Sequence, residues 1–192
     1  MLKSILESVM YADYIVWGYL NVRWHNSFLD TLMPFIRNQW TWAPLYLFLL
    51  LFMPKRFGRN GWIWCGAFLI TFGISDQISA SLLKPLFGRI RPCNDPYFSG
   101  IVHIIVPCGG GKSFPSSHAA NHFSLALFSA ISIQRHARWI WPAALFWAAI
   151  VAYAQVYVGV HYPLDVLCGG ILGCGVGIFT GRLFNKRVAL PD

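Results

Sequence analysis

The chain has 192 residues, of which 56% are hydrophobic and only 11% are charged, and its mean hydropathy is +0.51. Soluble globular domains carry about 25% charged residues, so this composition excludes an ordinary soluble domain and a disordered chain, and it indicates a polytopic membrane protein. The 15 Lys and Arg outnumber the seven Asp and Glu and give a net charge of +8. In so apolar a chain we interpret this excess as topology-setting charge at helix ends, together with an anion site, and not as a nucleic-acid-binding surface.

We predict an all-α integral membrane protein, a bundle of six transmembrane helices that forms a single domain over residues 1–192. No cleavable signal peptide is expected, because Glu7 and Asp13 interrupt the first apolar stretch. That stretch, about residues 8–24, is predicted either as a short span or as an amphipathic helix lying at the interface, and a span brings the count to six.

The second predicted segment, about residues 32–53, is apolar from Trp40 to Met53 but carries Arg37 and Asn38 in its first turns. Four later segments are apolar over about the 20 residues that a bilayer requires. They are residues 61–83, 116–134, 139–160 and 163–181.

Six crossings divide the cationic residues between two sides of the membrane. The side with the N-terminus holds nine, namely Lys3, Lys55, Arg56, Arg59, Arg135, Arg138, Arg182, Lys186 and Arg187. The other side holds six, namely Arg23, Arg37, Lys84, Arg89, Arg91 and Lys112. Because three of those six crowd into residues 84–91, where we expect an anion site, the positive-inside rule predicts that the first side is cytoplasmic. The second side then lies outside the cytoplasm.

Two cysteines test this sidedness. Cys93 and Cys108 lie in the predicted outer loop, whereas Cys65, Cys168 and Cys174 lie in apolar helices. In an oxidising compartment the two loop cysteines can pair, and closing a loop of about 15 residues is worth on the order of 3 kcal/mol in the chain-entropy model. The alternative is two free thiols in a flexible loop.

Three polar clusters stand at helix ends, and the predicted topology gathers all three on the outer side. In the first, Lys84, Arg89 and Arg91 bring three cations to one short stretch. Arginine binds phosphate bidentately and lysine acts as a point charge, so this stretch is either an anion site or an ordinary basic anchor at the interface.

The second cluster opens the predicted helix at residue 116. Ser116 is a natural N-cap with Pro115 ahead of it, and Ser117 and His118 follow. The free N–H groups of a helix start, with serine hydroxyls beside them, form an anion site. The alternative is a simple cap with a bystander histidine.

The third cluster pairs His161 with Asp165, with Pro163 suited to the first turn of the last helix. A carboxylate there can accept the proton of one ring nitrogen and leave the other as a lone pair, which is the arrangement of an oriented nucleophile. The alternative is a structural hydrogen bond. Taken together, two histidines, a carboxylate, three cations and a helix start match phosphoryl transfer through a phosphohistidine.

The order of these residues resembles the type 2 phosphatidic acid phosphatase superfamily of lipid phosphate phosphatases. Its first motif is a lysine followed, after six residues, by Arg-Pro, which matches Lys84, Arg91 and Pro92. Its second motif, Pro-Ser-Gly-His, matches residues 115–118, with Ser117 in the glycine position.

The third family motif is Ser-Arg, five residues, His, three residues and Asp. His161 and Asp165 match it, but Ala154 and Gln155 stand at the Ser-Arg positions. The family arginine is thereby lost, and the hypothesis that follows is that Arg89 or Arg37 supplies the missing cation.

The resemblance implies a role for each matching residue and no metal cofactor. His161 is then the nucleophile, Asp165 orients it, and His118 is the general acid and base. The residues implied to hold the phosphate are Lys84, Arg91, Ser116 and Ser117.

Two further polar positions have simpler interpretations. Asp76 lies at membrane depth, and we predict a supporting role as a buried partner of Lys84 or His122. His118 and His122 have the spacing of a zinc pair, but no suitable third ligand is evident, so no metal site is predicted.

A site at the outer membrane surface indicates a lipid phosphate as substrate and membrane lipids as surroundings. The chain is similar to small bacterial undecaprenyl pyrophosphate phosphatases, so undecaprenyl pyrophosphate is the expected substrate. Phosphatidylglycerophosphate, phosphatidate and lipid A 1-phosphate are alternatives, as is phosphate transfer to another lipid. Two other classes stay open, a small transporter or proton relay that uses Asp76, and a scaffold that Gln155 has left without activity.

Overall fold

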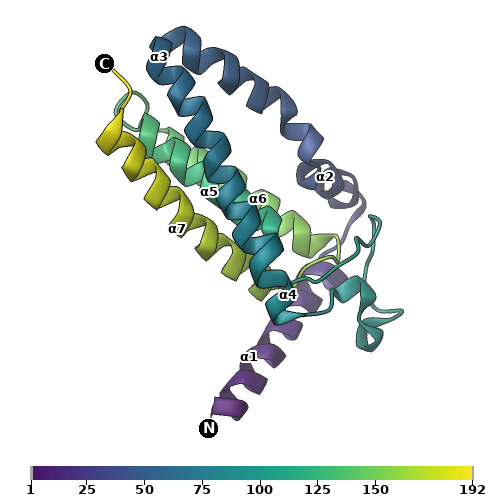
Figure 1. The fold of residues 1–192 in the computed structure, drawn as a ribbon. Helices are drawn as coiled ribbons and strands as arrows, with labels where there is room; N and C mark the ends of the chain where they lie inside the picture. Colours follow the sequence, from purple (N-terminus) through teal and green to yellow (C-terminus); the bar gives the residue numbers. More distant parts are fainter. Residues whose placement is uncertain (1, 192) are drawn as a thin grey trace.

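The computed structural model describes residues 2–191, and this part of the chain contains helices and loops but no strand (Figure 1). The all-helical prediction is therefore confirmed. The α-helices are α1 (Leu2–Trp17), α2 (Ser27–Arg37), α3 (Ala43–Asp76), α4 (Lys84–Phe87), α5 (Ser117–Ile133), α6 (Ile140–Tyr157) and α7 (Pro163–Arg187). Two π-helical segments, η1 (Gly18–Arg23) and η3 (Gln77–Leu83), and three short 3-10 turns, η2 (Gln39–Trp42), η4 (Pro92–Asn94) and η5 (Pro96–Phe98), connect them.

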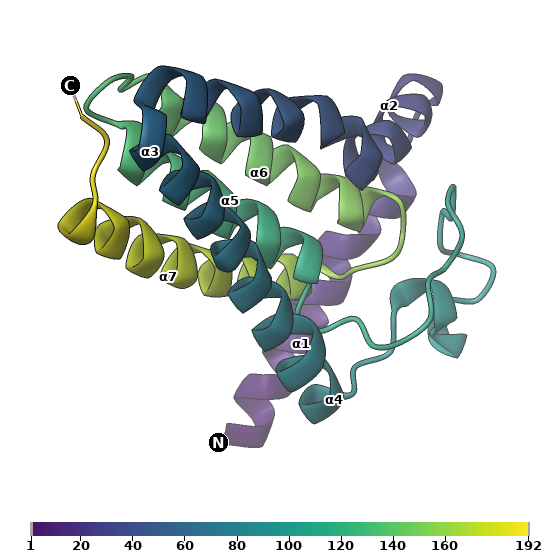
Figure 2. The same ribbon diagram turned by 45° about the horizontal axis from the view of Figure 1, so that its top comes forward.

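Helix α5 is the centre of the bundle, with α3, α6 and α7 packed around it (Figures 1 and 2). All of its side chains are buried except those of His118 and Phe123, which are half-buried. Helices that are largely apolar all round are buried, either in lipid or, as here, among other helices.

Glycines on one face of α7 allow it to approach the backbone of α5 closely. A methyl group on Gly169, Gly173 or Gly177 would overlap a carbonyl oxygen of α5 or of its cap, those of Ser116, Ala120 and Ser124 respectively. Small residues at four-residue spacing permit such contacts between membrane helices. This close approach brings the start of α5 against the start of α7. Gly175, by contrast, faces open space.

Helix α3 is two arms joined by a sharp reversal at Gly58, whose φ of 54° and ψ of −129° are not helical. Figure 1 shows the two arms folded against each other at the end opposite α4. A carbon at Cβ of Gly61 would overlap the carbonyl of Met53, so the arms meet through glycine. The second arm continues through η3 into α4 and carries Lys84 to the far end of the bundle.

The second predicted segment, residues 32–53, is not one helix. Helix α2 ends at Arg37, Asn38 is extended with ψ of 123°, and a new helix begins only at Ala43. The Asn38 side chain accepts a hydrogen bond from the Trp40 backbone N–H and so caps the turn η2, which is the physical reason for the break. Hydropathy alone does not detect a cap inside an apolar run.

Helix α1 and η1 run across the end of the bundle at which α5 and α7 begin (Figures 1 and 2). Trp17 is buried there against Phe98 and Tyr162, and Asn21 donates to the backbone carbonyl of Tyr157 at the end of α6. Of the two alternatives predicted for residues 8–24, this placement fits the interfacial helix.

Within residues 2–191, three helical stretches are long and apolar enough to cross a membrane: Gln39–Phe98, Ile140–Tyr157 and Pro163–Arg187. The first contains the reversal at Gly58, and α5 lies enclosed among them. The prediction of a multi-pass helical membrane protein is thus confirmed.

Candidate active site

The three predicted polar clusters meet in one cavity of about 670 Å³ at the end of the bundle crossed by α1. Seven predicted residues line it, namely Lys84, Arg91, Ser117, His118, Gln155, His161 and Asp76. Arg37, from the end of α2, lines it as well. The close α5–α7 contact, the end of α6 and the end of the long α3 arm place these side chains around a single space.

His161 is held with one ring nitrogen toward a carboxylate and the other toward a cation. Its Nδ1 lies 3.4 Å from Oδ2 of Asp165, and its Nε2 lies 3.3 Å from Nη1 of Arg91. A guanidinium can only donate, so Nε2 must be the acceptor and the ring proton must sit on Nδ1. The lone pair of Nε2 therefore faces the cavity.

The ring of His161 is almost completely buried, with 1% of its surface exposed. Burial lowers the pKa of His161 to about 4, although the hydrogen bond to Asp165 acts in the opposite direction. The ring is thus neutral at physiological pH, which is the state that a nitrogen nucleophile requires.

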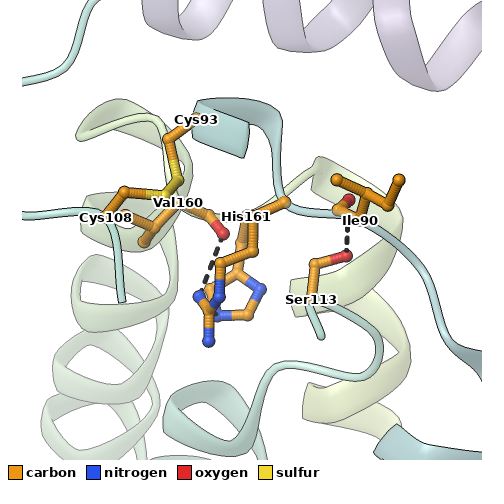
Figure 3. Close-up of a disulfide and its surroundings, with 7 residues drawn as sticks. Ile90, Cys93, Cys108, Ser113, Val160 and His161 are labelled. Atoms are coloured by element: carbon orange, nitrogen blue, oxygen red, sulfur yellow. Dashed lines mark hydrogen bonds between the residues drawn. A yellow bond between two sulfur atoms is a disulfide. The ribbon is translucent and has the colours of Figure 1, made fainter. Parts of the chain in front are cut away.

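The loop that carries Arg91 is fixed from both of its ends. Nη1 of Arg91 also donates to the carbonyl of Val160 at 3.2 Å. Cys93 and Cys108 form the predicted disulfide, with 5.9 Å between their Cα atoms. Figure 3 shows this bridge beside Val160 and His161. It also shows Ser113, on the part of the loop that returns after Cys108, donating through its hydroxyl to the carbonyl of Ile90.

Arg89 lies behind the cavity and joins two buried carboxylates. Its Nη1 donates to Oδ1 of Asp165 at 2.8 Å, and its Nη2 donates to Oδ2 of Asp13. Its guanidinium also lies 4.0 Å from the ring centroid of Tyr162. The structure does not support the hypothesis that Arg89 replaces the missing phosphate-binding cation, because Arg89 does not line the cavity and both of its Nη groups are bound to carboxylates. Its supporting role passes through Asp165.

The two serines at the start of α5 have different partners. The Ser116 hydroxyl accepts from the backbone N–H of Ala119 at 3.4 Å, and its own N–H donates to the carbonyl of Asp165 at 2.9 Å. It caps the helix and does not line the cavity. The buried Ser117 hydroxyl lines the cavity and has no hydrogen-bond partner within residues 2–191.

Several buried polar atoms at the cavity likewise lack a partner within the described residues. They are the Ser117 hydroxyl, Nε2 of Gln155, Nε of Arg91, Nε2 of His122 and Oδ1 of Asn121. Buried polar groups are almost always hydrogen-bonded, and each one left unpaired costs about 1–3 kcal/mol. A concentration of such atoms around one cavity provides hydrogen-bonding groups for water or for a polar ligand.

The predicted supporting role of Asp76 takes a different form from the one expected. Its Oδ1 accepts from the Asn121 side chain at 2.9 Å, and Nδ1 of His122 lies 2.8 Å from the carbonyl of His118 on its own helix. Asp76 is thus hydrogen-bonded to α5 through Asn121, and neither Lys84 nor His122 is its direct partner.

Two residues of the site area carried a weak sequence signal. Asp13 is an isolated acid in an apolar segment, and such an acid usually has a buried polar partner. No local feature of the sequence identifies Arg89 as that partner. Tyr162 binds Oδ2 of Asp95 through its hydroxyl at 3.0 Å and forms one wall around Arg89. The only sequence feature that pointed to Tyr162 as part of the site was its position between His161 and Pro163.

A second histidine cluster joins the long loop to α2. Nε2 of His103 lies 2.9 Å from Oδ1 of Asp30, which also accepts from the Tyr157 hydroxyl at 2.7 Å. The atoms of His25, Asp30 and His103 are near enough to share a metal ion. However, the two imidazole rings stack at 4.3 Å with planes 18° apart. A metal ion bound by both histidines must lie in both ring planes, and two nearly parallel stacked planes do not meet close to the rings. This cluster therefore holds the loop against α2 and is not a preformed metal site.

Similarity to known proteins identifies the family of this chain. The model of the PAP2 superfamily matches residues 62–189. The lipid A 4'-phosphatases of Bacteroides thetaiotaomicron and Porphyromonas gingivalis are 35% and 34% identical, over 83% and 81% of this chain and 70% and 66% of theirs. The undecaprenyl-diphosphatase BcrC of Bacillus subtilis is 29% identical over 84% of this chain and 76% of its own length.

Two solved structures share the fold. The LpxE structure of Aquifex aeolicus covers 88% of this chain and 94% of its own, with a TM-score of 0.69 and 23% identity. A transmembrane PAP2 type phosphatidylglycerolphosphate phosphatase from Bacillus subtilis covers 94% and 88%, with a TM-score of 0.71 and 24% identity. The predicted family and its enzyme class, the lipid phosphate phosphatases, are confirmed: this chain belongs to the PAP2 superfamily.

Proposed function

We propose that this protein hydrolyses a phosphate monoester or terminal phosphate on the head group of a membrane lipid, through a phosphohistidine on Nε2 of His161. The observation that carries the proposal is the orientation of that ring, with Nδ1 toward Asp165 and Nε2 toward the Arg91 guanidinium. An anionic phosphoryl group between Nε2 and Arg91 meets the nucleophile and a cation together.

The steps follow from the residues around the cavity. Nε2 of His161 attacks phosphorus, and the bond to the lipid oxygen breaks as the protonated form of His118, which the negative charge of the bound phosphate stabilises, donates its proton to that oxygen. The neutral His118 then accepts a proton from water, whose oxygen attacks the phosphohistidine and releases inorganic phosphate and His161. Lys84, Arg91 and the Ser117 hydroxyl stabilise the charge on the phosphoryl oxygens.

The apolar half of the cavity supports a lipid as substrate. Trp40, Tyr46, Phe68, Leu69 and Phe72 line it, and Trp40, Leu69 and Phe72 are also exposed on the outer surface of the bundle. A second cavity of about 610 Å³ shares Tyr46 and Phe68 with the first and continues toward the opposite end. Acyl or prenyl chains can lie along this apolar path while the phosphate enters the cationic end.

The relatives favour a phosphorylated glycolipid over the undecaprenyl pyrophosphate expected from sequence. Identity is 34–35% with two lipid A 4'-phosphatases and 28–29% with two undecaprenyl-diphosphatases. We therefore propose lipid A, or its 4'-phosphate-bearing precursor, as the first substrate to test, with undecaprenyl pyrophosphate second.

The cation distribution supports an active site facing the periplasm or cell exterior of the inner membrane. Because α1 lies at the end of the bundle that holds the cavity, Lys3 of α1 belongs to that end. Apart from the cations that line the cavity and Arg89 behind it, this end has only Lys3, Arg23 and Lys112. The opposite end keeps eight, namely Lys55, Arg56, Arg59, Arg135, Arg138, Arg182, Lys186 and Arg187. This is the asymmetry of a cytoplasmic end.

Phosphate release in detergent with EDTA present tests the proposal. The panel is lipid A, undecaprenyl pyrophosphate and phosphatidylglycerophosphate, with mass spectrometry to locate the phosphate removed. We expect release by the wild type, acid-labile labelling of the protein by radioactive lipid phosphate, and loss of both in His161→Ala. Activity that survives His161→Ala, or no release from any of the lipids, would contradict the proposal.

A further inference from the structure

Gln155 occupies the position where the third family motif has its arginine, and it cannot supply the charge of that arginine. Its side chain is completely buried, lines the cavity, and leaves Nε2 without a partner within residues 2–191. An amide at this position can donate a hydrogen bond to a phosphate oxygen, but it does not offset negative charge.

Arg37 reaches the same place from a different element. Its Nε donates to Oε1 of Gln155 at 3.3 Å, and its side chain lines the cavity. No Asp or Glu within residues 2–191 forms an ion pair with it. The hydrogen bond to Gln155 uses Nε, so both Nη groups keep their donors for a ligand.

The electrostatic setting of Arg37 is that of an incomplete anion site. Burial lowers the pKa of Arg37, and the nearby positive charge of Arg91 lowers it further. Two half-buried arginines held close together, with Lys84 on the same cavity, repel one another until an anion lies between them. Asp76, the one carboxylate that lines the cavity among the described residues, is hydrogen-bonded to Asn121.

The position of Arg37 is fixed by packing. Met33 and Ile36 of α2 are buried against Val151 and Ala154 of α6, the helix that carries Gln155. After Arg37 the chain turns back, and the indole N–H of Trp42 donates to the carbonyl of Ile36 at 2.8 Å. The break at Asn38, which separates α2 from α3, therefore determines where Arg37 points.

We infer that Arg37 and Gln155 together replace the motif arginine, with Oε1 of Gln155 orienting the Arg37 guanidinium so that its Nη groups bind the transferred phosphate. The inference rests on the proposed function. It assigns a substrate-binding residue in α2, outside the residues 62–189 that the family model matches. In this protein α2 thus supplies the cation of the phosphate site, and α6 supplies the amide of Gln155 that orients it.

An exchange of the two side chains tests the inference. Arg37→Gln is expected to reduce kcat/KM by roughly 10²–10³-fold, as is typical when one group that stabilises transition-state charge is lost. The double variant Arg37→Gln/Gln155→Arg, which returns the cation to α6, is expected to recover at least tenfold of that loss. Arg23→Gln is the matched control, because Arg23 is an exposed cation on the same side of the bundle that does not line the cavity.

A binding measurement separates this inference from the proposed reaction. Orthovanadate mimics the transferred phosphoryl group, and we expect it to raise the Tm of wild type and of the exchanged double variant but not of Arg37→Gln. A folded Arg37→Gln protein with unchanged kcat/KM, or with unchanged vanadate stabilisation, would overturn the inference while the proposed function stands. Failure of the double variant to recover either property would overturn it as well. If no lipid is hydrolysed at all, the proposed function fails, and vanadate binding still decides the role of Arg37.

Discussion

The guanidinium of Arg89 donates to Oδ1 of Asp165 at 2.8 Å, on the same carboxylate whose Oδ2 lies beside Nδ1 of His161. The Tyr162 backbone N–H also donates to that Oδ2, at 2.9 Å. The orientation of the His161 ring is therefore set by a chain of contacts that begins at Asp13 in α1. A buried carboxylate with three donors keeps one geometry, and the ring it holds keeps one tautomer.

We predict that Arg89→Gln lowers kcat by about tenfold or more and destabilises the protein. Both Asp13 and Asp165 have fully buried side chains, and removing one partner of a buried ion pair typically costs about 3–5 kcal/mol because a charge stays uncompensated. The measurement is kcat and Tm for Arg89→Gln beside Lys112→Gln, an exposed cation on the same side. An Arg89→Gln enzyme with wild-type kcat would show that Asp165 does not depend on this contact.

The effect of Asp13 on kcat is predicted to pass through Arg89. It also accepts from the backbone N–H of Leu164 at 2.8 Å, so it ties α1 to the first turn of α7. Asp13→Asn should lower kcat less than Arg89→Gln does, since the pair between Arg89 and Asp165 persists. In the double variant Asp13→Asn/Arg89→Gln the two losses should not add. Additive losses in the double variant would mean that the two residues act independently.

Stability should depend on pH through His161. Its pKa is about 4 in the folded protein and near 6.5 in an unfolded chain, so the unfolded state binds more protons between these values. The folded state therefore loses stability as pH falls from about 6.5 toward 4, by about 1.4 kcal/mol for each pKa unit of difference. Thermal unfolding at several pH values should show a smaller acid loss in His161→Gln than in wild type. Parallel curves for the two proteins would contradict the assignment.

The disulfide is predicted to stabilise the loop that presents Arg91, which lies two residues before Cys93. Removing it in Cys93→Ser/Cys108→Ser should cost on the order of 3 kcal/mol and lower kcat/KM. Reductant should lower the Tm of wild type but leave that of the double variant unchanged. If reductant lowered the Tm of both proteins equally, the loss of stability would not come from the bridge between Cys93 and Cys108.

The sequence predicted which residues meet in the site, but not the contacts that hold them in position. Lys84, His118 and His161 could be placed together because motif spacing and an even number of crossings brought their helix ends to one side. The ion pair of Asp13 with Arg89 spans 76 residues, and no local pattern reports a partner at that distance. Hydropathy likewise treats residues 32–53 as one apolar run, because a window average does not resolve the cap at Asn38.

The contact between Arg37 and Gln155 could be proposed from the sequence only as one of two alternatives. The motif comparison identified the missing arginine, and the charge of Arg37 within an apolar segment made it a candidate, as it did Arg89. Choosing between the two candidates required the direction in which each guanidinium points. That direction depends on tertiary packing of α2 against α6, which local sequence does not encode.

The α5–α7 contact gives the sharpest test of how the fold positions the chemistry. A methyl group on Gly173 would overlap the carbonyl of Ala120, so Gly173→Ala must push the helices apart at the level just inside His118 and Asp165. Overpacking of this kind typically costs about 1–3 kcal/mol, and we expect a lower Tm together with a lower kcat, because His118 moves relative to His161. Gly175→Ala is the matched control. It lies two residues further along the same helix and faces open space, so alanine there should leave kcat unchanged and raise stability by up to about 1 kcal/mol through helix propensity. If both variants behaved alike, the close approach of α7 to α5 would not be what aligns His118 with His161.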